Sequence, residues 1–227
     1  MSTRYVVKTG DNLSQIAARF HLRSWADIYN DAENADFRRR HPNPSLIFTG
    51  DVVMVPDPPG VFNHKLPDPP YVQQANTFWC WAAAMESWLT VTPGRDMFSQ
   101  NDLRSMFSSF TDPSNGGLTP VGWGEVAKRF NLEARMFTTS GLPGTDTPSQ
   151  ISPKFIYETL KQKGFIVIVY NLMPGGPAHT NIIYGIQSNS MMTNLQIMDP
   201  EDSGGGLLTR PLSHYTSRDF VGMLWAR

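Results

Sequence analysis

The chain has 227 residues, of which 40% are hydrophobic and 17% are charged, a globular balance that excludes bulk disorder. Its 19 Lys and Arg residues and 20 Asp and Glu residues give a formal net charge of −1, which provides no general attraction to nucleic acid or to an anionic membrane. The longest apolar runs are far shorter than the roughly 20 residues that a membrane-spanning helix needs. The first residues lack a long apolar region before a small-residue cleavage site, so we expect synthesis in the cytoplasm without a secretory signal peptide.

A proline-rich stretch divides the sequence into two parts. Residues 56–70 read PDPPGVFNHKLPDPP, and because prolines fix φ and disfavour helix at the preceding residue, we expect an extended, semi-rigid linker over residues 58–70. This places one domain at residues 1–57 and a second at residues 71–227, in a chain of the α+β class.

A strand, two helices and a closing strand are predicted in the first part. Residues 5–8 have a short strand pattern, and apolar residues then recur at helical spacing between 13 and 20, after a turn and a capping position. A second, shorter helical stripe covers residues 25–29. Residues 52–56 are the predicted closing strand.

This first part resembles a LysM module, through YVVKTGDNLSQIA at residues 5–17 and IFTGDVVMVP at residues 47–56. The resemblance implies a small βααβ fold that binds N-acetylglucosamine polymers such as peptidoglycan, or that docks onto phage tails and contractile injection machines. Residues 34–45 are inserted relative to such a module. We interpret the arginine run within them, at 38–40, as a solvated face rather than a phosphate or nucleic-acid site.

The second part contains Cys80, the single cysteine of the chain, so no internal disulfide can form. Good helix formers begin at Trp81, which puts Cys80 at or near the first turn of a helix. The unpaired N–H groups and the dipole of that turn stabilise a thiolate, the nucleophilic form of cysteine. The competing interpretation is a buried core residue, the commoner role of a lone cysteine. A free thiol also suggests a reducing environment.

A thiol nucleophile needs a base, and His179 is the best placed of the five histidines. It follows a loop and opens a predicted strand, and after a polar hairpin the next strand ends at Asp199-Pro200. Antiparallel pairing would bring Asp199 beside His179, where a carboxylate fixes the tautomer of the imidazole and stabilises its protonated form. Taken separately, a histidine on a strand is more often structural, and an Asp-Pro pair is more often a turn.

Gln74 precedes Cys80 by six residues, which can bring its side-chain amide beside the thiolate. The amide N–H and the backbone N–H of Cys80 could then stabilise an oxyanion. Trp123, Glu125 and the 116–117 loop are candidates for the border of the same cleft.

The order Gln-x5-Cys-Trp, a histidine that opens a strand and an Asp-Pro that closes the next resembles the papain-like cysteine peptidases. The similarity is greatest to compact bacterial members, the double-glycine leader peptidases of bacteriocin exporters and the injected effector proteases. It implies a helical lobe and an antiparallel sheet over residues 71–227. It also implies that Cys80 is the nucleophile, His179 the base and then the acid, Asp199 the orienting group (papain itself has Asn) and Gln74 the oxyanion donor.

We expect neither a metal nor another cofactor. No group of His, Cys and carboxylate residues has the spacing of a zinc site. The run Gly204-Gly205-Gly206 lacks a following Lys-Ser/Thr, so it is interpreted as a flexible loop rather than a phosphate cradle.

The two resemblances together predict a thiol endopeptidase that acts as a bacterial effector toxin and cleaves a protein in a target cell. Delivery by a contractile apparatus such as type VI secretion would make it an agent of interbacterial antagonism, with an immunity protein in the producing cell. The LysM-like part would contact peptidoglycan or the secretion apparatus, and neither nucleic acid nor membrane is an expected partner. The alternatives are a non-catalytic peptidoglycan-binding or docking protein and an amidase that cuts the stem peptides of peptidoglycan.

Overall fold

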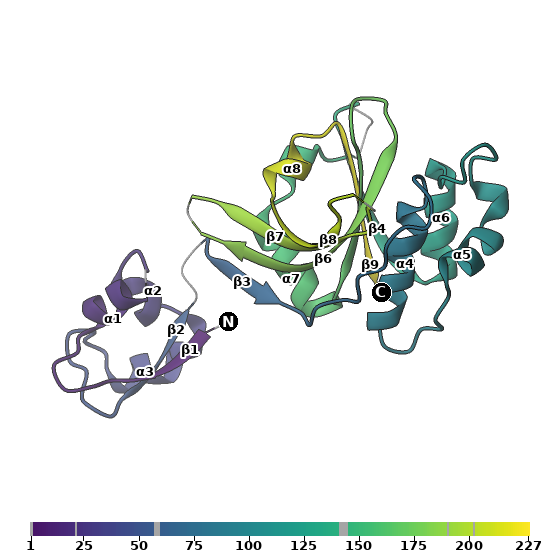
Figure 1. Cartoon of the computed structure of the whole chain (residues 1–227). Helices are drawn as coiled ribbons and strands as arrows, with labels where there is room; N and C mark the ends of the chain where they lie inside the picture. Colours follow the sequence, from purple (N-terminus) through teal and green to yellow (C-terminus); the bar gives the residue numbers. More distant parts are fainter. Residues whose placement is uncertain (1, 21, 57–59, 141–144, 190, 202) are drawn as a thin grey trace. The chain divides into compact units, whose positions relative to one another are not determined.

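The computed structural model describes residues 2–20, 22–56, 60–140, 145–189, 191–201 and 203–227 (Figure 1). The chain forms two compact units, Met1–Val61 and Phe62–Arg227, each with its own hydrophobic core. Among the described helices, none has both the length and the apolar character needed to cross a bilayer.

The first unit consists of a two-stranded antiparallel sheet and three short helices. The predicted order of strand, helix, helix and strand is present, and the inserted residues 34–45 add a third helix before the closing strand. The elements are β1 (Ser2–Val6), α1 (Leu13–Arg19), α2 (Trp25–Tyr29), α3 (Ala35–Arg40) and β2 (Val52–Pro56).

The inserted segment is part of the fold of this unit. Asn34 is buried, and its side-chain amide donates to the carbonyl oxygens of Ile28 and Met54 and accepts from the Met54 N–H, so all of these polar atoms are paired. Arg38 is half-buried and donates to the carbonyl of Tyr29, at the end of α2. The predicted solvated face therefore applies to residues 39–40, which are exposed, and not to Arg38.

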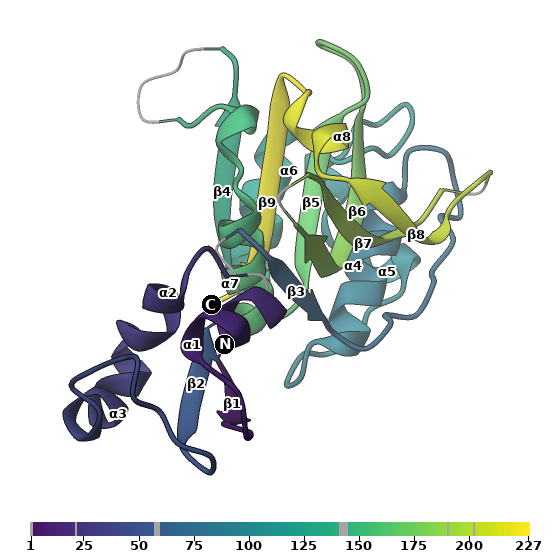
Figure 2. The same ribbon diagram turned by 90° about the vertical axis from the view of Figure 1, so that its left-hand side faces the viewer.

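The second unit is built on a seven-stranded antiparallel sheet within the described residues, in the order β4-β9-β5-β6-β7-β8, with β3 also paired to β6. Figure 2 shows β4, β9, β5 and β6 side by side. The strands are β3 (Phe62–Lys65), β4 (Leu132–Thr138), β5 (Ile166–Asn171), β6 (Ala178–Ser188), β7 (Thr193–Asp199), β8 (Gly206–Pro211) and β9 (Phe220–Ala226).

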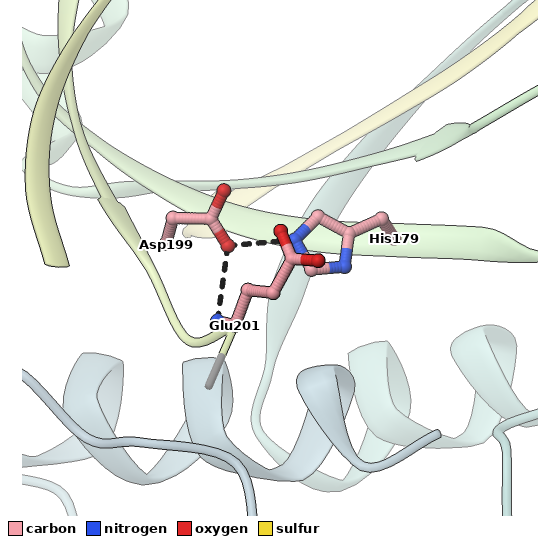
Figure 3. Close-up of side chains that lie close together, drawn as sticks. All are labelled: His179, Asp199 and Glu201. Atoms are coloured by element: carbon pink, nitrogen blue, oxygen red, sulfur yellow. Dashed lines mark hydrogen bonds and ion pairs between the residues drawn. The ribbon is translucent and has the colours of Figure 1, made fainter. Parts of the chain in front are cut away.

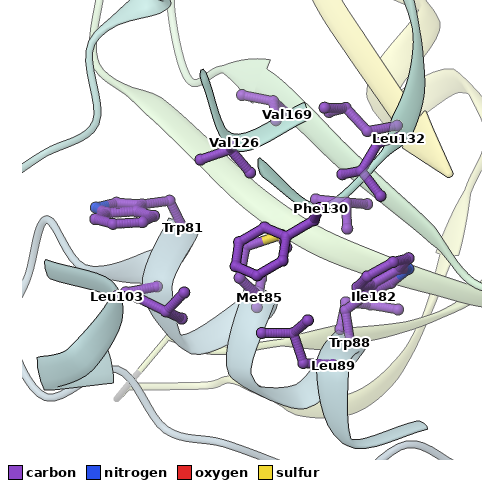
Figure 4. Packing of buried hydrophobic residues seen from close by; sticks show 14 of the residues in the cluster. Trp81, Met85, Trp88, Leu89, Leu103, Val126, Phe130, Leu132, Val169 and Ile182 are labelled. Carbon is purple, nitrogen blue, oxygen red and sulfur yellow. The ribbon is translucent and has the colours of Figure 1, made fainter. Parts of the chain in front are cut away.

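Helices cover both faces of this sheet, and the alternation of β5 shows why. Val167 and Val169 pack into a cluster with α4, α5 and α6 (Figure 4), whereas Ile166 and Ile168 pack into a second cluster with α7 and α8. A strand that is apolar on both faces needs a layer on each side. The helices are α4 (Cys80–Val91), α5 (Gln100–Met106), α6 (Pro120–Arg129), α7 (Pro153–Lys163) and α8 (Ser213–Thr216).

The prediction of a linker over residues 58–70 was wrong for residues 62–65. They form β3, which pairs antiparallel with β6 from Phe62 opposite Ser188 to Lys65 opposite Gly185, and the second unit begins with this strand. The Leu66 N–H continues the pairing with a bond to the Tyr184 carbonyl. Residues 58–59 of the predicted linker lie outside the described residues.

Candidate active site

Cys80 is the first residue of α4, and its sulfur lies against the start of β6. Trp79 precedes the helix, and a turn closed by its N–H and the Asn76 carbonyl leads into it. The first N–H groups of a helix have no acceptor within the helix, so the end of α4 that carries Cys80 has a partial positive charge. The Sγ atom is 3.9 Å from the carbonyl oxygen of Ala178 and 3.9 Å from Oγ1 of Thr180, and only 6% of the residue is exposed.

The β6–β7 hairpin brings His179 and Asp199 together. The register places Ile182 opposite Met198, and the strands are antiparallel. Asp199, the next residue of β7, therefore lies beside the first residues of β6, which include His179. His179 Nε2 is 2.7 Å from Asp199 Oδ1 (Figure 3). Since the carboxylate occupies Nε2, Nδ1 is the ring nitrogen left for the Cys80 sulfur.

The surroundings of His179 favour its charged form. Burial by itself would lower its pKa, but hydrogen bonds to Asp199 and Cys80 and the negative charges of both groups outweigh burial and raise the pKa to about 10. A histidine with this pKa is an imidazolium at neutral pH. The imidazolium stabilises a nearby thiolate.

Asp199 is fully buried and ionised. Burial acts to raise its pKa, yet the hydrogen bond and charge of His179, the Glu201 N–H and the positive charge of Arg210 together hold the pKa below its usual value. The Glu201 N–H donates to Oδ1 at 3.1 Å, and the Arg210 guanidinium donates to Oδ2. The carboxylate therefore has a fixed orientation between two cationic partners.

Arg210 belongs to a second layer that the sequence analysis missed. It lies on β8, and its Nη1 is 3.1 Å from the Tyr170 hydroxyl and 3.1 Å from His214 Nε2. The Tyr170 ring packs edge-on against both His179 and His214, with centroid separations of 5.7 and 5.3 Å. Tyr170, Arg210 and His214 lie on β5, β8 and α8, far apart in the sequence and without a shared motif. The sequence pattern could therefore indicate the strands that carry two of them, but not that the three side chains meet.

Gln74 is buried next to the strand end that carries Asp199. Its backbone N–H donates to the Pro200 carbonyl at 2.8 Å. Its side-chain Nε2 donates to the Thr77 carbonyl at 3.0 Å, and this leaves the second amide N–H for another acceptor. No hydrogen bond joins Gln74 to Cys80 in the part of the chain that the structure describes.

A cleft of about 400 Å³ opens beside Cys80. One wall comes from the α4–α6 region, with Gly117 and Trp123, and the other from residues 175–178, which lead into His179. Of the candidates for its border, Trp123 and Gly117 line the cleft, whereas Glu125 and Gly116 are not among the described residues that line it.

Gly116 joins the wall of the cleft that contains Gly117 and Trp123 to the start of α4, where Cys80 lies. Its carbonyl accepts from the Trp81 indole N–H at 3.2 Å, and its φ is +78°. A Cβ there would lie 2.7 Å from Cζ of Arg104 and 2.9 Å from Nε1 of Trp79, so the position requires glycine.

His179, Asp199 and Glu201 are close enough to be considered as metal ligands, since one ligand atom of each lies within 4.8 Å of the others. However, His179 Nε2 and Asp199 Oδ1 are directed at each other at hydrogen-bond distance. A cation between them would have to break that bond. The arrangement is suited to proton transfer along the imidazole rather than to metal binding.

A thiol at the start of a helix beside a histidine–carboxylate pair is the arrangement of a cysteine hydrolase. The family model described as "Papain-like cysteine protease AvrRpt2" matches residues 63–206, more than half of the chain. The chain therefore belongs to this family and is a papain-like cysteine protease.

No curated protein matches the sequence, whereas several solved structures do, including the following two. A C39-like peptidase from Bacillus anthracis has a TM-score of 0.47 at 13% identity, over 73% of this chain and 98% of its own. A structure from a comparison of the mite allergens Blo t 1 and Der p 1 has a TM-score of 0.43 at 12% identity, over 72% of this chain and 70% of its own.

Proposed function

We propose that the protein is an endopeptidase in which Cys80 is the nucleophile, His179 the base and then the acid, and Asp199 the residue that orients the imidazole. The observation that carries this proposal is the 2.7 Å contact between His179 and the buried Asp199, with Cys80 close enough to the same imidazole to help raise its pKa. The match to a protease family fixes the kind of reaction but not these roles.

The proposed reaction begins from a Cys80 thiolate and a His179 imidazolium. The thiolate attacks the carbonyl carbon of the scissile peptide bond, and the resulting oxyanion accepts from the Cys80 backbone N–H and from the second amide N–H of Gln74. His179 gives its proton to the leaving amine as the C–N bond breaks. Water, deprotonated by His179, then attacks the thioester, and breakage of the C–S bond releases the acid product and restores the Cys80 thiolate beside the His179 imidazolium.

The cleavage role is tested by mapping new protein N-termini in bacteria that express the wild type or Cys80→Ala. We expect a set of new N-termini that appears only with the wild type. Its absence, with both proteins folded, would refute the endopeptidase proposal. Loss of turbidity of purified cell walls, dependent on Cys80, would instead favour the amidase.

We further propose that the first unit is a LysM-like module and that the whole chain is an antibacterial effector delivered by a contractile apparatus. The support is the sequence resemblance of residues 5–17 and 47–56 and the single free cysteine, Cys80. Cytoplasmic expression of the wild type should arrest bacterial growth, Cys80→Ala should not, and an immunity protein of the producing cell should restore growth. Equal growth of the two strains would contradict the effector role.

Pull-down with purified peptidoglycan tests the module separately. Residues 1–61 and the full-length Cys80→Ala protein should both be retained if the module binds glycan. If neither is retained, the module does not bind the wall, and docking onto the delivery apparatus is the remaining proposal.

A further inference from the structure

The carboxylate of Asp199 has two cationic partners, and only His179 is used by the mechanism. Oδ1 faces His179 Nε2 and the Glu201 N–H, while Oδ2 is bonded to Nη2 of Arg210. Asp199 is 0% exposed, so water does not solvate the second oxygen in place of the guanidinium. A buried carboxylate with one oxygen unpaired would favour its protonated form.

Arg210 is itself held in one orientation. Its side chain is 21% exposed, and its second nitrogen, Nη1, is 3.1 Å from both the Tyr170 hydroxyl and His214 Nε2. To accept from the guanidinium, His214 Nε2 must carry no proton, and the low pKa of His214, about 4, which follows from its burial and from the charges of Arg210 and Arg218, agrees with this. The guanidinium is thus supported from β5 and α8 while it contacts the end of β7.

We propose that Arg210 is a positioning residue of the catalytic centre, which keeps Asp199 ionised and aimed at His179 and so sustains the thiolate–imidazolium pair. This inference rests on the proposed roles of Cys80, His179 and Asp199. Among the described residues, Arg210 makes no hydrogen bond to the thiol or to the imidazole, and its direct bond to the catalytic group is the one to Asp199.

The charged and titratable groups around this pair come from several elements. Facing Asp199 and Arg210 are His179 on β6, Glu201 after β7, Tyr170 on β5 and His214 on α8. Arg218 provides a matched control. It lies 5.6 Å from the centre of the Tyr170 ring and donates to backbone carbonyls, but it makes no hydrogen bond or ion pair with Asp199 among the described residues.

The test is the rate of Cys80 alkylation by iodoacetamide in the full-length protein between pH 3 and pH 9, followed by mass spectrometry. Loss of an opposite charge within contact distance changes a carboxyl pKa by about one to three units. On the proposal, protonation of Asp199 weakens the thiolate–imidazolium pair, so the alkylation rate falls at acid pH, which forms the acid limb of the profile. The pH at which it falls should therefore rise by about one unit or more in Arg210→Met. It should stay near the wild-type position in Arg210→Lys, which keeps the charge, and in Arg218→Met. A purely structural role would change thermal stability without moving the limb.

An acid limb in Arg210→Met that coincides with the wild type, or an equal shift in Arg218→Met, would overturn the proposal. If Arg210→Met does not fold, Arg210→Gln decides in the same way, because it keeps a hydrogen-bond donor and loses the charge. A wild-type Cys80 that reacts only near pH 8.5, as a free thiol does, would refute the proposed catalytic pair itself, which is a different outcome.

Discussion

At the scale of single residues, Asp199, the proposed orienting group, is a charged carboxylate, whereas papain has a neutral asparagine in the orienting role. A neutral amide orients an imidazole by a hydrogen bond only, whereas Asp199 also balances the charge of Arg210 in a buried site. Replacement by Asn would preserve the shape and leave the guanidinium without its counterion. The substitution Asp199→Asn therefore separates the effect of the negative charge from the effect of the shape and hydrogen bonding of the side chain.

We expect Asp199→Asn to lower kcat by up to about 10⁴-fold, the loss seen when the carboxylate of a Ser-His-Asp triad is replaced by its amide. The physical reason is that Arg210, no longer neutralised, makes the nearby imidazolium less favourable. Cleavage of a substrate peptide, together with the melting temperature, gives the measurement. Activity within about threefold of the wild type would mean that orientation alone is needed.

The raised pKa of His179 gives a prediction about its coupling to the thiol. Two of the causes that raise it to about 10 are the hydrogen bond and the charge of Cys80, so Cys80→Ala should lower the pKa of His179. Histidine NMR titration of both proteins measures this directly. A His179 titration that does not change would show that the thiol is not coupled to it.

The same raised pKa fixes the sign of a pH effect on stability. A histidine that binds its proton more tightly when folded contributes stabilisation that is fully present below its ordinary pKa of 6.5 and is lost as the pH rises through about 10. The free energy of unfolding should therefore fall as the pH rises between these two values. In Cys80→Ala, where the pKa of His179 is expected to be lower, the fall should be complete at a lower pH. Chemical denaturation at several pH values in that range gives the comparison.

At the scale of elements, local patterns were enough to predict the parts that carry the proposed nucleophile and base. The run of helix formers after Cys80 indicates where α4 begins, and a single hairpin relates His179 to Asp199, so both can be anticipated from short stretches of sequence. Arg210 could not be anticipated, because its place depends on three strands and α8 packing together. β3 was missed because its partner, β6, lies more than a hundred residues further along the chain.

The end of α7 shows how one residue fixes the entry into β5. Gly164 has φ 86° and ψ −147°, a conformation that is nearly restricted to glycine, and an added Cβ would meet no neighbouring atom within 4 Å. Gly164→Ala should therefore destabilise the unit through backbone strain alone, by about 1–3 kcal/mol.

Thermal unfolding measures this effect, and Gly124→Ala is its control. Gly124 lies within α6 and also has open space around its Cβ position, but alanine is favoured inside a helix by about 0.5–1 kcal/mol. The two variants should shift the melting temperature in opposite directions. A drop for both would indicate that contacts, and not the backbone conformation of Gly164, determine the result.

At the scale of the whole molecule, the boundary between the units has a consequence for how the protease can be isolated. β3 completes the pairing of β6, the strand that begins with Ala178 and His179, and the partly buried Leu66 packs against both core clusters of the second unit. The segment that the sequence suggested was a linker therefore supports the sheet on which the proposed base is placed.

We expect a fragment of residues 62–227 to fold and to retain rapid alkylation of Cys80, and a fragment of residues 71–227 to melt at a lower temperature with slower alkylation. Removal of β3 leaves residues 185–188 of β6 unpaired on one edge and exposes the apolar surface under Leu66. The variant Leu66→Ala in the full chain checks the same contact without a deletion, and should cost about 1–2 kcal/mol. Equal melting temperatures for the two fragments would show that β3 contributes nothing to the sheet, and that the boundary drawn from the prolines was sufficient.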